Sequence, residues 1–155
     1  MVVDSAFAEP VALPAESCRA ACAAPWPVLS SRRETDRLIA HLRSAILCHD
    51  DQREHAVVLY SDAGRRYLGE AALEVGNTAS LALCPRTILS RGFALGASGM
   101  ILAHNHPSGD CRPSAADELA TRRLVWLGQM VGLVLLDHLI VTSTKVFSMR
   151  ARGWL

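Results

Sequence analysis

Residues 103–117, with the sequence AHNHPSGDCRPSAAD, determine how the rest of the chain is interpreted. The apolar run Gly99-Met-Ile-Leu-Ala103 leads into this stretch and predicts a buried strand. Pro107, Gly109 and Pro113 exclude a continuous strand or helix beyond it, because proline lacks a backbone donor and glycine favours turns. The stretch therefore predicts a strand, a tight loop and then the start of a helix at Ser114.

Three side chains of this stretch are of the types that bind transition metals. His104 and His106 are two residues apart at the end of the predicted strand, so their imidazoles point to the same side. Asp117 lies in the first turn of the predicted helix and can fold back to meet them. Two imidazole nitrogens and one carboxylate oxygen leave a fourth tetrahedral position open, which is the usual arrangement of a catalytic zinc site. The pattern predicts a metal site.

Parts of the pattern also have a purely structural explanation. Ser114-x-x-Asp117 is a helix-capping pattern, and taken alone such a pair is more often structural than catalytic. A single histidine at the end of a strand is usually an ordinary packed or exposed residue. Packing does not require two imidazoles beside one turn, however, so the pair His104 and His106 favours the metal site. We interpret Cys111, in the same loop, as a bystander.

The spacing of these residues resembles a known signature. His104-x-His106, seven intervening residues and Ser114-x-x-Asp117 match the JAMM (JAB/MPN) metalloprotease motif, and the fuller string HNHPSGD resembles the RadC family within it. Residues 135–141, LLDHLIV, and more loosely 84–86, CPR, add to the likeness, which covers roughly residues 35–155. The resemblance implies a three-layer α/β/α fold like that of cytidine deaminases. Deamination itself is not expected, because the chain lacks the Pro-Cys-x-x-Cys and His-x-Glu motifs of zinc deaminases.

The resemblance also implies roles for individual residues. His104, His106 and Asp117 would hold zinc, Glu54 would take the position of the family's proton-transferring glutamate, and Ser114 that of its oxyanion-stabilising serine. Without the resemblance, Glu54 would be interpreted as an ordinary carboxylate at the end of a strand, and Glu70 and Glu74 are alternatives to it. Asn105 stands where the deubiquitinase branch has Ser or Thr, and the RadC branch has Asn there.

Asp137 and His138 form a polar pair in an otherwise apolar predicted strand. Successive strand residues face opposite ways, so at most one of the two points toward the predicted site. One hypothesis is that it orients a metal-binding histidine, since such histidines usually donate their second N–H to another group. A buried structural pair is the alternative.

Hydrophobic periodicity and turn residues predict the remaining elements. We expect helices from Thr35, from Pro85 to about residue 97 and over 114–130, and strands over 54–60, 65–70, 99–104, 134–142 and 145–149, with 71–83 extended or irregular. Because strands and helices interleave, the sequence predicts an α/β fold with a mixed sheet flanked by helices. Residues 1–30, with four of the seven prolines, are expected to form a flexible N-terminal arm before one domain over 31–155.

Composition limits the class of partner. The formal net charge is only +1, and the chain leaves no room for the helix-hairpin-helix region that often precedes the JAB part in bacterial relatives, so we do not expect direct DNA binding. No stretch resembles a membrane span or signal peptide, and five cysteines without a framework spacing favour reduced thiols in a cytoplasm.

The sequence therefore predicts a zinc-dependent hydrolase that cuts a peptide or isopeptide bond in a peptide or protein substrate. The alternative is an accessory protein of DNA repair or DNA metabolism in which the metal is structural, since the family has long carried a DNA-repair label. A metal-dependent nuclease or phosphoesterase is a third possibility, but one three-ligand site lacks the two-metal arrangement usual for phosphodiesters.

Overall fold

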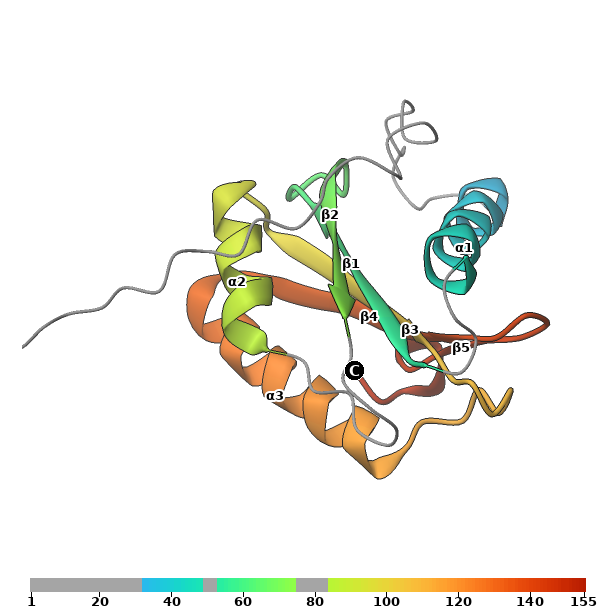
Figure 1. The fold of residues 1–155 in the computed structure, drawn as a ribbon. Coiled ribbons are helices and arrows are strands. Elements are labelled where there is room, and N and C mark those ends of the chain that lie inside the picture. Colours follow the sequence, from blue (N-terminus) through green and yellow to red (C-terminus); the bar gives the residue numbers. More distant parts are fainter. Residues whose placement is uncertain (1–31, 49–52, 75–83) are drawn as a thin grey trace, which may run out of the picture.

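The computed structural model describes residues 32–48, 53–74 and 84–155. Within these ranges the chain forms three α-helices, five strands and one short 3-10 helix (Figure 1). In chain order the elements are α1 (Arg32–Leu47), β1 (His55–Ser61), β2 (Tyr67–Glu74), α2 (Pro85–Ala94), β3 (Gly99–Asn105), α3 (Ala115–Val131), β4 (Val134–Val141), β5 (Val146–Ser148) and η1 (Arg150–Arg152). The predicted N-terminal arm over residues 1–30 lies outside the described residues.

The five strands form one mixed sheet in the order β2-β1-β3-β4-β5. β3 and β4 run parallel, while the other neighbouring pairs are antiparallel. The parallel pair is joined by α3, since a parallel connection needs a crossover that a helix normally supplies. The expected mixed sheet is confirmed.

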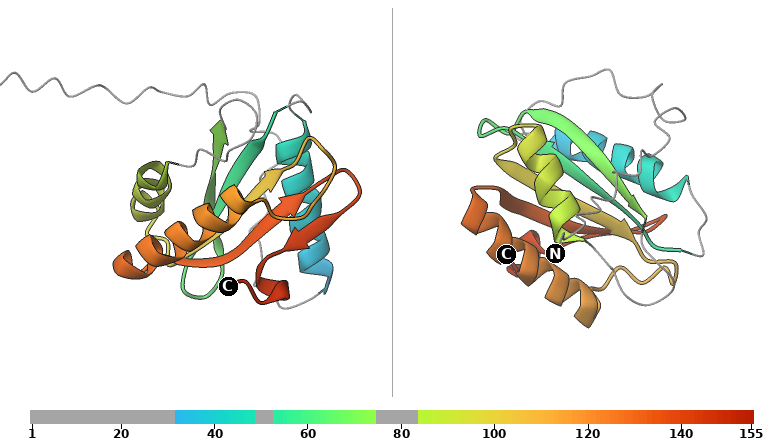
Figure 2. Two further views of the ribbon diagram at one scale, coloured as in Figure 1. Left: turned by 90° about the horizontal axis from the view of Figure 1, so that it is seen from below. Right: turned by 60° about the vertical axis from the view of Figure 1, so that its left-hand side comes forward.

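Helices cover both faces of the sheet. α1 packs Leu38, Leu42 and Ile46 against one face, where they join Val57 and Ile101 in a buried cluster. α2 and α3 lie on the opposite face (Figure 2). The core on that side contains apolar residues of these two helices and of the three central strands: Ile88, Leu124, Val58, Tyr60, Met100, Leu102 and Leu135. The sheet is therefore the middle layer of three, and the predicted α/β/α architecture is confirmed.

The ends of three elements differ by two residues or more from the sequence-based expectation. α1 begins at Arg32 rather than Thr35, and α2 ends at Ala94 because Gly96 takes a left-handed conformation with a φ of 63°. β2 begins only at Tyr67, since Arg65 has a φ of 65° in the turn after β1, and it continues to Glu74, beyond the predicted end at residue 70.

β4 contains a bulge that changes which of its side chains face each side of the sheet. The residues before and after Leu136 pair with consecutive residues of β3: Leu135 with Met100, and Asp137 with Ile101. Leu136 is thus an extra residue, and such a residue reverses the alternation of the strand beyond it. Leu135 therefore packs in the core on the α2 and α3 side, while both Leu136 and Leu139 pack in the core on the α1 side. His138 consequently faces the α3 side.

The connection between α3 and β4 requires glycine. A Cβ atom on Gly128 would lie 2.2 Å from the carbonyl oxygen of Leu133, and Gly132 ends the helix with a φ of 74°. The Leu133 N–H donates to the Gly128 carbonyl at 2.9 Å, which brings the chain back to the sheet at once. This tight return sets the position of α3 against β4.

Candidate metal centre

The structure brings together the three predicted metal ligands at the end of β3. His104 lies within β3 and is fully buried, His106 follows the strand, and Asp117 lies in the first turn of α3 with an exposed fraction of 1%. His104 Nε2 lies 2.9 Å from His106 Nε2 and 3.1 Å from Asp117 Oδ1, while His106 Nε2 lies 3.2 Å from Asp117 Oδ2. One ligand atom from each residue falls within 4.8 Å of the other two, so the group could hold a metal ion.

Asp117 is held at this point by the helix cap. The Ser114 hydroxyl accepts a hydrogen bond from the Asp117 N–H at 3.2 Å, and Asp117 Oδ2 accepts from the Ser114 N–H at 2.7 Å. The Ser114 hydroxyl also donates to Asp117 Oδ2 at 2.7 Å. The capping interpretation of Ser114-x-x-Asp117 is therefore confirmed, and in the same arrangement Oδ1 faces His104 while the capping oxygen Oδ2 also lies against His106.

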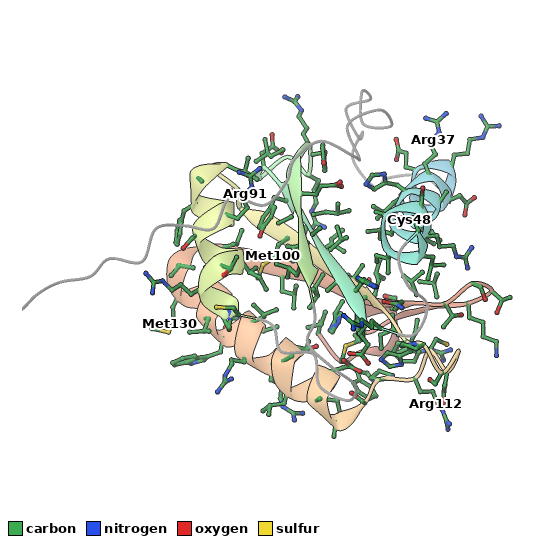
Figure 3. All side chains as sticks on the ribbon, in the orientation of Figure 1. Arg37, Cys48, Arg91, Met100, Arg112 and Met130 are labelled. Atoms are coloured by element: carbon green, nitrogen blue, oxygen red, sulfur yellow. The ribbon has the colours of Figure 1, made fainter. Side chains whose placement is uncertain are left out.

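The loop after β3 fixes the orientation of His106. Its Nδ1 lies 2.7 Å from the carbonyl oxygen of Asp110, and because a carbonyl only accepts, Nδ1 holds the hydrogen. In the neutral ring, Nε2 then presents a lone pair toward His104 and Asp117. The loop is closed by Arg112, whose guanidinium donates to the Asp110 carboxylate at 2.7 Å on the outer edge of the molecule (Figure 3).

Charges in the group are strongly coupled. Burial by itself would raise the pKa of Asp117, but the neighbouring His104 and His106 rings and the Ser114 hydroxyl outweigh it and lower that pKa well below its ordinary value. The hydrogen bond to Asp117 raises the pKa of His106, and the negative charge of Glu54 adds to this effect. The site therefore combines the ionised carboxylate of Asp117 with imidazole rings beside it, and together these groups favour a bound cation.

These residues fit a transition metal such as zinc. Imidazole nitrogen and carboxylate oxygen are ordinary zinc ligands, and two histidines with one carboxylate are a common catalytic set. The two Nε2 atoms and the carboxylate oxygens point at one another, and donor atoms that converge in this way suit a bound cation.

His138, rather than Asp137, contacts a metal-site histidine, His104. His138 Nε2 lies 2.9 Å from His104 Nδ1, and its Nδ1 lies 2.6 Å from the Thr121 hydroxyl oxygen. Burial, with the neighbouring His104 as the next contribution, lowers the pKa of His138 from 6.5 to about 3, so the ring is neutral at physiological pH. Asp137 instead accepts hydrogen bonds from the Arg150 N–H and the Ser148 hydroxyl and so fixes the turn into η1.

The predicted proton-transferring residue, Glu54, immediately precedes β1 and is half-buried. The strand begins at His55, one residue later than expected, and Ala56 pairs with His104. Of the alternatives, Glu70 is bound to His41 of α1 at 2.7 Å, and the strand pairing of β1 and β2 puts it opposite Leu59, three residues beyond Ala56. The side chain of Glu74 lies outside the described residues.

Two residues at the site were not assigned a role from the sequence. Thr121 connects His138 to the Asp117 carbonyl, and its place four residues after Asp117, on the same face of α3, was the only available signal. Asn105 is buried and bonds the backbone on both sides of Glu54: its Oδ1 accepts from the His55 N–H at 2.6 Å and its Nδ2 donates to the Arg53 carbonyl at 2.9 Å. These bonds join residues that are about 50 positions apart in the chain, so no local sequence pattern indicates them.

Comparison with known proteins places the chain in a family. The family model described as RadC-like JAB domain matches residues 33–154. Over 104 residues the chain is 39% identical to a UPF0758 protein of Aquifex aeolicus (strain VF5); the match covers 67% of this chain and 45% of the relative, so the chain spans less than half of that protein. Within the described residues no helix combines the length and apolarity that a bilayer crossing needs. The chain belongs to the RadC family, and the JAB domain of that family accounts for most of this chain.

Proposed function

We propose that this domain is a zinc-dependent hydrolase that cuts peptide or isopeptide bonds in a peptide or protein substrate. The observation that supports it is the convergence of His104, His106 and Asp117 into one group that could hold a metal ion, with the negative charge of Glu54 close enough to affect the pKa of His106. Membership of the RadC family, within the JAB/MPN group, supports the same reaction class.

In this proposal His104, His106 and Asp117 hold the ion. A zinc ion in such a site lowers the pKa of a bound water from about 15.7 to about 7 and polarises a substrate carbonyl. The protein contributes two buried ligands, His104 and Asp117, and one half-buried ligand, His106, and this set of three leaves one coordination position to solvent or substrate.

Glu54 is the proposed general base and acid. Its carboxylate takes a proton from the attacking water and gives it to the leaving nitrogen. Its half-buried place before β1, and the effect of its charge on the pKa of His106, support a position near the ligands. Asn105 supports the role further, because it binds the backbone on either side of Glu54.

Ser114 is the proposed donor to the oxyanion that forms on the substrate carbonyl. Its hydroxyl has one hydrogen, which in this structure goes to Asp117 Oδ2. Oxyanion stabilisation thus requires that the hydroxyl rotates away from Asp117, while the Ser114 N–H keeps its own bond to that carboxylate.

The first test is the metal content of protein purified without a histidine tag, with Asp117→Ala as the matched variant. We expect about one zinc per chain in the wild type and none in Asp117→Ala. A search for peptide substrates then follows, with Glu54→Gln as the variant that binds zinc but does not turn over. If the wild type binds no zinc even when zinc is added, the hydrolase proposal fails, and an accessory role in DNA metabolism becomes the better proposal.

A further inference from the structure

A hydrogen-bonded network of four buried residues connects two of the candidate metal ligands by a second route. His104 Nδ1 lies 2.9 Å from His138 Nε2, His138 Nδ1 lies 2.6 Å from Thr121 Oγ1, and Thr121 Oγ1 lies 2.6 Å from the backbone carbonyl oxygen of Asp117. None of the four residues is more than 2% exposed. Water therefore does not substitute for any of these bonds.

The direction of each hydrogen in the network follows from its carbonyl end. The Asp117 carbonyl only accepts, so at 2.6 Å the Thr121 hydroxyl must give it its single hydrogen. The other neighbour of that hydroxyl, Met149 Sδ at 3.3 Å, is the weaker acceptor. With its hydrogen committed, the Thr121 oxygen can only accept from His138.

The same logic continues through the two imidazoles. His138 Nδ1 must hold a hydrogen in order to donate to Thr121, and the neutral ring then has a bare Nε2. A bare Nε2 accepts, so the hydrogen between the rings belongs to His104 Nδ1. His104 in turn has a bare Nε2, which is the atom that faces His106 and Asp117.

We propose that His138 and Thr121 are positioning residues that hold His104 in the Nδ1–H tautomer, so that its Nε2 lone pair is ready for a metal ion. This proposal rests on the metal binding in the proposed function and adds the residues that prepare the site for it. Because Thr121 is bonded to the backbone of Asp117, one network fixes the orientation of a histidine ligand relative to the carboxylate ligand.

The opposite tautomer loses a bond of this network, and the Nε2 hydrogen that it gains would point at Asp117 Oδ1, 3.1 Å away, where a metal ion would bind. If His104 held its hydrogen on Nε2, the bare Nδ1 would face His138, which would then need its own hydrogen on Nε2. A neutral His138 would in that case present a bare Nδ1 to the Thr121 oxygen, and the bond at 2.6 Å would be lost in a buried place. The alternative therefore costs a buried hydrogen bond and blocks the ligand atom with a proton.

Thr121→Val tests the proposal because valine keeps the shape of threonine and removes the hydroxyl. We expect zinc affinity, measured by competition with a chromophoric chelator, to fall about 10-fold to 100-fold, as is typical when the partner of a metal-binding histidine is removed. Thr121→Ser should restore most of the affinity. Thr142→Val is the matched control: Thr142 is equally buried and bonds Lys145, away from the network, so its loss should leave zinc affinity unchanged.

The protonated nitrogens can be observed directly by long-range 1H–15N correlation spectra of the 15N-labelled full chain without metal. We expect His138 and His104 to show the hydrogen on Nδ1 and a bare Nε2 in the wild type, and His104 to show a mixture of tautomers in Thr121→Val. His104 with its hydrogen on Nε2 in the wild type would overturn the proposal.

The two measurements separate this proposal from the hydrolase proposal. A wild type that binds no zinc would overturn the proposed function, and the spectra would still decide the tautomer. A wild type that binds zinc, together with a folded Thr121→Val variant of equal affinity, would overturn the positioning role alone. His138→Gln provides a second variant, expected to lower zinc affinity to a similar extent.

Discussion

The Asn105 carboxamide oxygen lies 2.6 Å from the backbone nitrogen of His55, 50 residues earlier in the chain. Its amide nitrogen donates to the Arg53 carbonyl at 2.9 Å, so one side chain bonds the backbone on both sides of Glu54. Asn105 itself stands between His104 and His106. The residue between the two metal-site histidines therefore fixes the chain that presents the proposed proton-transferring group.

Asn105→Ala should lower the free energy of unfolding by about 1–3 kcal/mol, because it removes two hydrogen bonds of a side chain that is 3% exposed. Zinc content should remain near that of the wild type, because all three ligands are retained, while hydrolysis should fall as Glu54 loses its fixed position. Urea unfolding and metal analysis of the same sample check this. An unchanged unfolding midpoint would contradict the structural role given to Asn105.

Zinc should raise the unfolding temperature, and this effect should shrink as the pH falls. Asp117 raises the pKa of His106 above its ordinary 6.5, so below that raised value zinc must displace a proton from the ring, whereas above it the ring is already neutral. At free zinc of 100 times the Kd the expected gain is about 2.7 kcal/mol. Thermal scans with zinc or EDTA from pH 8 to pH 5.5 measure it. If stabilisation by zinc did not depend on pH, or if the Asp117→Ala variant retained it, the result would count against the proposed metal site.

Ser114→Gly and Ser114→Ala should separate the capping role of the serine from its proposed catalytic role. Loss of the cap costs about 1 kcal/mol in the alanine variant but only a few tenths in the glycine variant, since glycine is itself an acceptable N-cap. Loss of an oxyanion donor lowers kcat about 100-fold to 1,000-fold in both variants. Once a substrate is found, near-normal turnover by Ser114→Gly with bound zinc would show that the serine only caps the helix.

Glu70→Gln should show a stability difference that depends on pH. The hydrogen bond from His41 lowers the pKa of Glu70 below 4.5, so the ionised carboxylate stabilises the fold above about that pH. This contribution is lost as the pH falls through the lowered pKa, and the two proteins should then converge. With a side chain 31% exposed, the expected difference at pH 7 is only about 0.5 kcal/mol. Urea midpoints from pH 7 to pH 3 test it, and a constant difference would refute it.

Gly128→Ala should destabilise the protein by about 1–3 kcal/mol, because the new methyl group would meet the Leu133 carbonyl at 2.2 Å and the backbone must shift. Gln129→Ala is the matched control on the next residue, since that side chain is exposed and the change should stay within about 0.5 kcal/mol. Equal unfolding midpoints for the two variants would show that the turn after α3 can relax at no cost.

The convergence of the three candidate ligands could be predicted because short-range rules determine it. Strand alternation puts His104 and His106 on one side, and the cap at Ser114 fixes Asp117 in the first helical turn. The mixed sheet between two layers of helices was predictable for the same reason, since it follows from the order of local periodic segments. The metal, and the roles of Glu54 and Ser114, stay predictions.

Two features of the site could not be predicted from the sequence. One depends on a bulge that interrupts the alternation of a strand, and the other on contacts between residues far apart in the chain. Alternation alone could not decide between Asp137 and His138, because the bulge at Leu136 reverses the facing of the strand just before them. The bonds of Asn105 to residues 53 and 55 join β1 to the end of β3 only in the folded sheet.

The crossover from β3 through α3 to β4 has a consequence for how such a domain can change during evolution. The three candidate ligands and the two residues proposed to position them lie in one continuous stretch, residues 99–141, while Glu54 immediately precedes the neighbouring antiparallel strand, β1. In the proposed function, metal binding and bond cleavage thus depend on separate parts of the chain. If the domain is the proposed hydrolase, a descendant with a neutral residue at position 54 would keep the metal ligands and could bind peptides without cutting them.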